Sequence, residues 1–414
     1  MDSQAQRTDH TPADAQSGDC ASLPSLLDQE WLIANRVGAY ASSTVIGCNT
    51  RRYHGLLIAA TNPPVGRLMA LSSVVEQLVI GDDTYDLATN EFDDVFSPEG
   101  YKHRDQFDQD VIPRFTFSVG EGKLTKEILL AESTNAVVIR YTWHGPACQL
   151  LLRPLVAMRN FHHTRRSASA SHMTFHTVEG GVVVHDRQTT THDLHLTSPE
   201  ADFQPQGDWW YGFRYRADEA RGFGGDHEDL YCPGEFTWEL EDGDSCELLA
   251  SLDEPGLLFF ESALSRRRER LARLEASVGT DADPLTRQLA RATDAFLVKR
   301  PFSDRPGGLS ILAGFPWFAD WGRDTFIALP GLLLTTGRFE QARQVFATFA
   351  AAVKDGLIPN RFDDDTAGAH YNSIDASLWF CIAAERYLQA TGDERFFHDH
   401  LVPAMDNILT TMAQ

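Results

Sequence analysis

Ten consecutive residues, 315–324, combine the side chains that a protein needs to bind a sugar. They read FPWFADWGRD and stand directly before the apolar run TFIALPGLLL. Trp317 and Trp321 offer flat apolar faces that fit the C–H face of a pyranose ring. Asp320, Arg323 and Asp324 offer charge-assisted hydrogen bonds to hydroxyl groups. The combination predicts a loop that contacts a carbohydrate.

Helix capping is the simpler interpretation of the same residues. Asp324 stands in front of the apolar run, so its carboxylate could accept hydrogen bonds from the first free N–H groups of a helix. Arg323 would then be its ion-pair partner, and Gly322 would allow the backbone to turn sharply or to approach another segment closely. The two interpretations are compatible with each other.

Two later segments place similar residues in front of predicted helices. GLIPNRFDDD (356–365) contains Asn360, and HYNSIDASLW (370–379) contains Asn372 and Asp375. Each residue alone is also explained by turn or cap chemistry. Loops that precede the inner helices of one helical barrel meet at the same end of it, so we expect these side chains to line one pocket with the 315–324 loop.

A polar block near the N-terminal end is a further candidate for ligand contact. CNTRRYHGLLIAA (48–60) sets four polar residues before an apolar strand. The alternative is a turn at a sheet edge with solvated arginines. The predicted ligand contacts of this block are Arg51, Arg52, Tyr53 and His54.

Metal and nucleotide sites find little support in the sequence. His162 and His163 are adjacent, so they would point apart on a strand, and no carboxylate cluster lies near them in sequence. The six cysteines lie far apart, with no CxxC pair. No GxGxxG, Walker or GxSxG motif occurs. We therefore predict no metal site and no nucleotide-binding site.

Short strands dominate residues 26–260. AVVIRYTWH (136–144) and GGVVVHD (180–186) are rich in β-branched and aromatic residues and are bounded by turn-forming residues. RFTFSVGEGKLTKEILL (114–130) reads as a hairpin with its turn near Gly120 and Gly122. Regular short strands of this kind predict a large antiparallel β-sandwich.

Helical periodicity begins after residue 260. Residues 261–279 read as an exposed amphipathic linker helix, and 338–356 and 373–392 read as amphipathic helices of the next domain. The segment 325–337 is apolar on every side, so we expect it to be buried all round. Alternation of such helices predicts an (α/α)6 barrel, and because too few helices precede Gln414, we expect the barrel to be truncated.

The composition and the local patterns of the sequence indicate which classes of binding partner are disfavoured and where the chain divides into parts. Acidic residues number 59 and basic residues 36, a net charge of −23, which disfavours nucleic acid and anionic membranes. The polar start lacks the apolar core of a signal peptide, and with scattered cysteines this predicts a cytoplasmic protein. The predicted divisions are a disordered tail at 1–25, a β-sandwich at 26–260, a helical linker at 261–284 and barrel helices at 285–414.

Several long motifs resemble a known family. EWLIANRVGAYASSTVIGCNTRRYHGLLIAA (30–60) and the segment 209–240 resemble the N-terminal domain of bacterial and archaeal glycogen debranching enzymes. AGFPWFADWGRDTFIALPGLLLTTGRFEQAR (313–343), GLIPNRF (356–362) and YNSIDASLWF (371–380) resemble the start of the amylo-α-1,6-glucosidase domain of that family. The resemblance implies a β-sandwich followed by an (α/α)6 barrel, no cofactor, and an α-glucan such as glycogen or limit dextrin as the partner.

The same resemblance implies an activity and assigns roles to residues. The implied reaction is hydrolysis of single α-1,6-linked glucose stubs at branch points. Carried over by motif, Arg323 and Asp324 would hold the terminal glucose, and Trp321, Asn360, Asn372 and Asp375 would line its pocket.

An inverting glycosidase needs a carboxylic acid and a carboxylate base roughly 6.5–9.5 Å apart. No motif of this sequence matches the acid or the base expected from the family, so both are expected beyond Gln414, with Asp320, Asp324 and Asp375 as substitutes. Two alternatives stay open: another α-glucan or trehalose hydrolase of the same architecture, and a glucan-binding protein without catalytic carboxyl groups.

Overall fold

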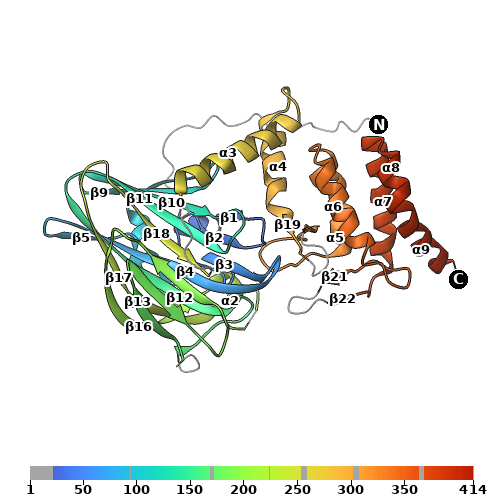
Figure 1. Ribbon diagram of the computed structural model, residues 1–414. Coiled ribbons are helices and arrows are strands. Elements are labelled where there is room, and N and C mark those ends of the chain that lie inside the picture. The colour runs from blue at the N-terminus through green and yellow to red at the C-terminus, as the bar shows by residue number, and fades with distance from the viewer. Residues whose placement is uncertain are drawn as a thin grey trace, which may run out of the picture.

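The computed structural model describes residues 22–93, 95–167, 172–222, 224–252, 259–301, 307–362 and 368–413. Figure 1 shows a part built of strands and a part built of helices, with helices α3 and α4 between them. Most of the predicted tail at 1–25 lies outside the described residues. Where it is described it differs from the prediction, because α1 (Leu23–Leu27) already begins at Leu23 and buries Leu27 against Val45 and Ile46.

The larger sheet is antiparallel and carries the residues that later form one side of the candidate site. Its spatial order is β1-β2-β3-β4-β12-β17-β16-β6-β7, with β5 paired to β4. The strands are β1 (Glu30–Ala34), β2 (Tyr40–Thr44), β3 (Gly55–Asn62), β4 (Val65–Ile80), β5 (Asp83–Asp86), β6 (Thr89–Phe92), β7 (Val95–Glu99), β12 (Cys148–Asn160), β16 (Asp202–Arg214) and β17 (His227–Leu240).

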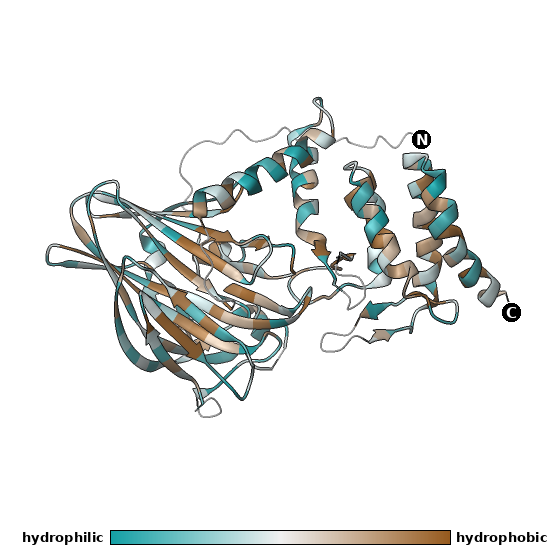
Figure 2. Ribbon diagram, in the orientation of Figure 1, coloured by the Kyte–Doolittle hydropathy of each residue, from teal (hydrophilic) through white to brown (hydrophobic). Residues whose placement is uncertain are grey.

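The second sheet packs against the first. Its order is β13-β14-β15-β18-β11-β10-β9-β8. The strands are β8 (Arg104–Gln109), β9 (Pro113–Val119), β10 (Gly122–Leu130), β11 (Ala136–His144), β13 (Thr174–Val178), β14 (Gly181–His185), β15 (Asp193–Thr197) and β18 (Ser245–Ser251). One core unites both sheets, with Leu57 and Leu150 from the first and Ile128, Ile139 and Leu248 from the second. Figure 2 shows the matching alternation of hydrophobic and hydrophilic residues along the strands.

Several predicted elements are confirmed at residue level. The predicted strand 136–144 is β11, and the predicted hairpin at 114–130 is the β9–β10 pair, with Val119 opposite Gly122 at its turn. The predicted linker helix is α3 (Phe260–Ser277), which buries Leu264, Leu271 and Leu274. These elements depend on local pattern, which the sequence carries in full.

The remaining elements are short turns, further helices and two small strand pairs. The 3-10 turns are η1 (Gly100–Lys102) and η3 (Thr293–Phe296), and the π-helical turns are η4 (Pro330–Leu334) and η5 (Phe397–Leu401). The further helices are α2 (Arg216–Ala220), α4 (Pro284–Ala292), α5 (Gly322–Leu329), α6 (Phe339–Ala350), α7 (Ile374–Thr391), α8 (Glu394–Phe396) and α9 (Val402–Met412). The further strands form two small pairs, β19 (Leu297–Lys299) with β20 (Leu309–Ile311) and β21 (Arg361–Phe362) with β22 (Ala369–His370).

Aromatic packing holds α5, α6 and α7 together. The Phe326 ring lies 5.4 Å from Phe346 and 4.9 Å from Phe380, measured between ring centroids. All three side chains are buried in one cluster. Helix α7 ends where Gly392 adopts a left-handed conformation (φ 64°), and its N–H donates to the carbonyl of Leu388. A rigid helical core therefore stands behind the loops that precede α5 and α7.

Two helix predictions are wrong in detail. The segment 325–337 is not buried all round, because Ile327 is 47% exposed and no described element covers that face. The helix predicted at 338–356 stops at Ala350, and the chain turns within the predicted range at Asp355 (φ 51°) and Gly356 (φ 72°). The β-rich part followed by a helical part is as predicted, and the (α/α)6 arrangement of the helices stays a prediction.

Candidate functional site

The loop 315–324 forms one wall of a pocket between the two parts of the chain. The pocket encloses about 470 Å³. The β-rich part and the loop after α2 contribute three of the lining residues, and the helical part contributes the others. The lining consists of Tyr53, His162, Arg221, Trp317, Phe318, Ala319, Trp321 and Arg361.

A buried arginine of the larger sheet fixes this loop. Arg67, on β4, is 4% exposed, and its guanidinium donates to the carbonyls of Pro316 and Phe318, each at 2.9 Å. It also lies 5.3 Å from the ring centroid of Phe315, whose ring meets that of Tyr40 edge-on at 5.5 Å. Because these contacts hold the backbone on both sides of Trp317, the β-rich part determines where that indole lies.

Trp317 is the centre of an aromatic surface. Its ring centroid lies 5.6 Å from that of Tyr53 and 6.3 Å from that of Phe318. The Arg221 guanidinium lies 5.5 Å from the indole, within cation–π range. Trp317 and Tyr53 are half-buried, and Phe318 is 46% exposed. A partly exposed aromatic face beside a guanidinium suits the apolar face and the hydroxyl edge of a sugar.

Gly322 brings the two candidate loops into contact. Its N–H donates to the carbonyl of Asn360 at 2.8 Å, and a Cβ atom here would stand 2.2 Å from the carbonyl oxygen of Pro359. Trp321 forms a β-bridge with Arg361, whose guanidinium lies 6.0 Å from the Trp321 ring. Only glycine permits this approach, which is the role that the sequence suggested for it.

Arg323 and Asp375 form an ion pair between α5 and α7. Arg323 Nη2 lies 2.7 Å from Asp375 Oδ2, and the two side chains are 52% and 39% exposed. The Arg323 hydrogen bond, with a second from Ser373, lowers the pKa of the Asp375 carboxyl. Helix α5 begins at Gly322, and no side chain caps it, so Asp324 lies exposed in its first turn rather than at the cap. The capping interpretation is therefore wrong, and Arg323 pairs with Asp375 instead of Asp324.

Asn360 and Asn372 connect the other two loops. Asn360 Nδ2 donates to Asn372 Oδ1 at 3.1 Å. Asn360 is 7% exposed, and its Oδ1 atom is buried without a hydrogen-bond partner among the described residues. Asn372 is exposed. The structure therefore brings the two amides into contact with each other at the ends of their loops. Neither is among the residues that line the 470 Å³ pocket.

Asp320 does not fit the role predicted for it. Its side chain is fully buried, and the Arg300 guanidinium donates to both carboxylate oxygens, with Nη2 2.6 Å from Oδ1. A buried carboxylate that is held in this way has no surface to offer to a hydroxyl group or a water. The structure contradicts a sugar-binding or catalytic role for Asp320.

Of the predicted block at 51–54, only Tyr53 lines the pocket. Arg51 donates to Glu30 at 2.6 Å, and His54 is 2% exposed, with its Nδ1 accepting from the N–H of Thr50. Arg52 is 8% exposed and binds Asp218 and the carbonyls of His162 and Gly224. These three residues fold the loop, which contradicts both predictions made for them, ligand contact and solvated arginines.

The pocket contains residues that sequence reasoning missed. His162 Nδ1 lies 3.1 Å from the Tyr53 hydroxyl, and burial, aided by the charge of His163, lowers the pKa of His162. Arg221 also lines the pocket, and no sequence pattern marks it, whereas Arg361 belongs to the segment 356–365 in which the sequence predicts ligand contacts. In the described part of the chain, no group of His, Cys, Asp or Glu residues is arranged to hold a metal ion. The pocket lining has no carboxyl group among the residues described.

The two parts of the chain match two family descriptions. Residues 29–247, more than half of the chain, match the family described as glycogen debranching enzyme N terminal. The chain belongs to the glycogen debranching enzyme family. Residues 291–414 match the family described as amylo-alpha-1,6-glucosidase. The pocket of this debranching-family chain thus takes its lining from both matched regions.

The similar proteins are longer than this chain. The glycogen debranching enzyme of Saccharomyces cerevisiae (strain ATCC 204508 / S288c) is 44% identical over 91 residues, which are 20% of this chain and 6% of the yeast protein. A bacterial glucoamylase complexed with acarbose has a TM-score of 0.50 and 11% identity over 92% of this chain and 56% of its own. The chain therefore spans a minor part of the first relative and about half of the second. That structural likeness supports the order of a β-rich part followed by helices.

In the described part of the chain, each helix is too short or too polar to cross a bilayer.

Proposed function

We propose that this chain binds branched α-glucan in the pocket between its two parts and belongs to an enzyme that hydrolyses single α-1,6-linked glucose stubs at branch points. The observation that carries the proposal is the pocket itself. Trp317 and Trp321 form its aromatic wall, and Arg323 with Asp375 stands on the neighbouring helix ends, in a chain that matches both debranching families. An α-glucan is a neutral polyol, so it suits aromatic faces with a few charged hydrogen-bonding groups at their edge.

Each group has a part in this proposal. Trp317, Tyr53 and Phe318 would stack against the sugar rings of the chain that bears the branch. Arg323, Asp324 and Asp375 would bind hydroxyls of the terminal glucose, with the ion pair holding the Asp375 carboxylate ionised. Asn360 and Asn372 would position the loops that carry these groups.

The acid and the base are a separate part of the proposal. Inverting hydrolysis needs two carboxyl groups on opposite sides of the scissile bond, roughly 6.5–9.5 Å apart. The described lining has none, so we place both beyond Gln414 in the whole protein. Asp324 and Asp375 stand nearest to this role within the chain, but Asp375 is an ionised partner of Arg323, which suits a base and not an acid.

The test measures binding and hydrolysis separately on the same chain. Titration calorimetry with a singly glucosylated maltooligosaccharide, its unbranched counterpart and trehalose should show the branched sugar binding most tightly. Trehalose or the linear sugar binding more tightly would overturn the proposed substrate. Glucose release by this chain would instead make Asp324 and Asp375 the residues to replace and would refute a catalytic pair located elsewhere.

A non-catalytic glucan-binding protein is the second candidate, because none of the described residues that line the pocket carries a carboxyl group. Full-length protein that binds the branched sugar but releases no glucose would support it. Release by the full-length protein alone would support the enzyme.

A further inference from the structure

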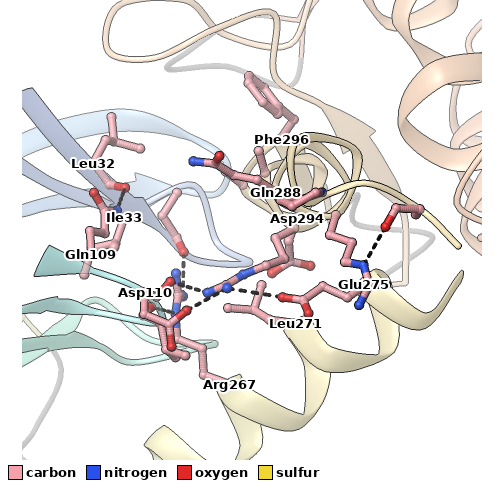
Figure 3. Close-up of a pocket in the computed structure, with 18 residues that line it drawn as sticks. Leu32, Ile33, Gln109, Asp110, Arg267, Leu271, Glu275, Gln288, Asp294 and Phe296 are labelled. Carbon is pink, nitrogen blue, oxygen red and sulfur yellow. Dashed lines mark hydrogen bonds and ion pairs between the residues drawn. The ribbon is translucent and has the colours of Figure 1, made fainter. Parts of the chain in front are cut away.

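A second and larger pocket lies where the β-rich part meets helices α3 and α4. It encloses about 860 Å³ and shares no lining residue with the pocket that contains Trp317. Figure 3 shows that its walls come from β1, from the loop after β8 and from α3, α4 and η3. The lining consists of Leu32, Ile33, Ala34, Gln109, Asp110, Val111, Arg267, Leu271, Glu275, Ala282, Pro284, Arg287, Gln288, Arg291, Ala292, Asp294, Ala295 and Phe296.

The three carboxylates of this lining are each paired with an arginine, and two of them share one. Asp110 and Glu275 both pair with Arg291, at 2.7 and 3.2 Å. Asp294 pairs with Arg36 at 2.8 Å and with Arg270 at 2.9 Å. Asp294 therefore has more than one positive partner, whereas Asp110 and Glu275 share the single charge of Arg291.

Arg267 is different, because it has only carbonyl partners. Its Nε atom donates to the carbonyl of Val111 at 2.9 Å, and its Nη1 atom to that of Ala34 at 3.4 Å. Within the described residues, no carboxylate lies at ion-pair distance from it. Burial, with the nearby charge of Arg270, lowers the pKa of Arg267 to about 10, so the side chain stays cationic at neutral pH. Its charge is uncompensated by any direct partner.

Arg287 adds a second positive charge in the same wall. Its Nε and Nη2 atoms donate to the carbonyls of Ala282 and Thr280, at 3.0 and 2.7 Å. In the structure as described, it too has no carboxylate partner. The lining holds three arginines and three carboxylates, and two of the arginines, Arg267 and Arg287, have no carboxylate at ion-pair distance among the described residues. Guanidinium groups without such a partner favour an anionic ligand, and phosphate in particular.

The other residues of the pocket wall fit an anion that also carries an organic group. Leu32, Leu271 and Phe296 give it an apolar side, and Gln288 gives it an amide (Figure 3). A volume of about 860 Å³ is typical of sites that enclose a small organic molecule. We propose that this pocket binds a small organic phosphate, with the phosphate group on Arg267, added attraction from Arg287 and the organic body against Leu32, Leu271 and Phe296.

Phenyl phosphate is a suitable probe, because it joins a phosphate group to an apolar ring and is not a sugar. Titration calorimetry of the whole 414-residue chain should show one site for it, with weaker binding of inorganic phosphate and none of phenol. Binding should weaken as salt is raised, as expected for an ionic contact. Absence of phenyl phosphate binding at millimolar concentration, or equal binding of phenol, would overturn the proposal.

Matched variants locate the site. Arg267→Gln should weaken phenyl phosphate binding roughly tenfold or more, since it removes a charge-assisted contact. Arg268→Gln makes the same change on the next residue of α3, which is exposed and does not line the pocket, and should keep the wild-type affinity. Equal losses in the two variants would refute the site.

Arg287→Gln tests the same site in a way that does not depend on whether Arg267→Gln folds correctly. Arg287 is exposed and its two hydrogen bonds go to carbonyls of the adjoining loop, so its replacement should cost little stability. We expect phenyl phosphate affinity at low salt to fall about threefold or more, through the lost positive charge. An unchanged affinity would place the phosphate elsewhere.

Discussion

At the residue scale, Trp317 shows how a site residue depends on groups that lie far away in the sequence. Its backbone is held by Arg67 from β4, and its ring meets Tyr53 from the loop before β3. The sequence showed that an indole stands in the loop, but the position of that indole depends on contacts across more than 200 residues. An accessible ring in this setting should contribute directly to glucan affinity.

Trp317→Ala should weaken binding of a maltooligosaccharide roughly tenfold, about 1–2 kcal/mol, because it removes an apolar face that stacks on sugar. Calorimetric titration measures this. Tyr211→Ala is the matched control, since Tyr211 is 63% exposed on β16 and lines neither pocket. A similar loss in both variants would mean that Trp317 has no special part in binding.

Glu30 gives a pH-dependent prediction. Burial alone would raise the pKa of Glu30, but hydrogen bonds and charges from His54 and Arg51 outweigh it and lower that pKa to about 2. The folded state therefore favours the ionised form. Its stabilising effect is complete above the ordinary value of 4.5 and disappears as the pH falls towards 2.

Glu30→Gln should lower the free energy of unfolding by about 1 kcal/mol at pH 7, because the carboxylate is partly exposed. Urea titrations of both proteins at about pH 7, 5, 4 and 3 give the difference in their free energies of unfolding at each pH. It should stay constant from pH 7 to 5 and shrink below that. A difference that grows on acidification would contradict the assigned ion pair.

At the element scale, prediction succeeded where the pattern is local and failed where partners are distant. Strand β11 and the β9–β10 hairpin follow from alternation and turn residues within one short segment. The block at 51–54 was misread because Arg52 is held by Asp218, 166 residues away. Asp320 was misread in the same way, since nothing in the sequence marks Arg300 as its partner. Polar residues that build loops and polar residues that bind ligands look alike in sequence.

The helical core gives the prediction at this scale. Phe380→Ala on α7 should lower the free energy of unfolding of the helical part by about 3–5 kcal/mol, because it leaves a cavity against Phe326 and Phe346. Ile382→Ala on the same helix, where the side chain is 40% exposed, should cost about 1 kcal/mol or less. Urea unfolding followed by far-ultraviolet circular dichroism compares them. Equal effects would show that α7 does not pack as described.

At the scale of the whole molecule, one carboxylate connects the two parts. Asp294, on η3, pairs with Arg36 from the loop after β1 and with Arg270 from α3, and it lies 3.8 Å from Arg338 ahead of α6. Its side chain is 9% exposed. Because the two cores are separate clusters, the relative position of the parts depends on junction contacts of this kind. The pocket that contains Trp317 lies across the same junction, so its geometry depends on them too.

Asp294→Asn keeps the shape of the side chain but leaves three arginines facing one another without their shared counter-charge. We expect a loss of about 3–5 kcal/mol in the stability of the junction. Urea unfolding should then separate into two transitions, with the helical part unfolding first, and maltooligosaccharide affinity should fall because the walls of the pocket that contains Trp317 no longer hold their distance. Asp110→Asn removes a partner of Arg291 at a side chain that is 72% exposed, and should change stability by about 1 kcal/mol or less. A single transition in Asp294→Asn with an unchanged midpoint would show that other contacts, such as those of Arg67, hold the two parts together without Asp294.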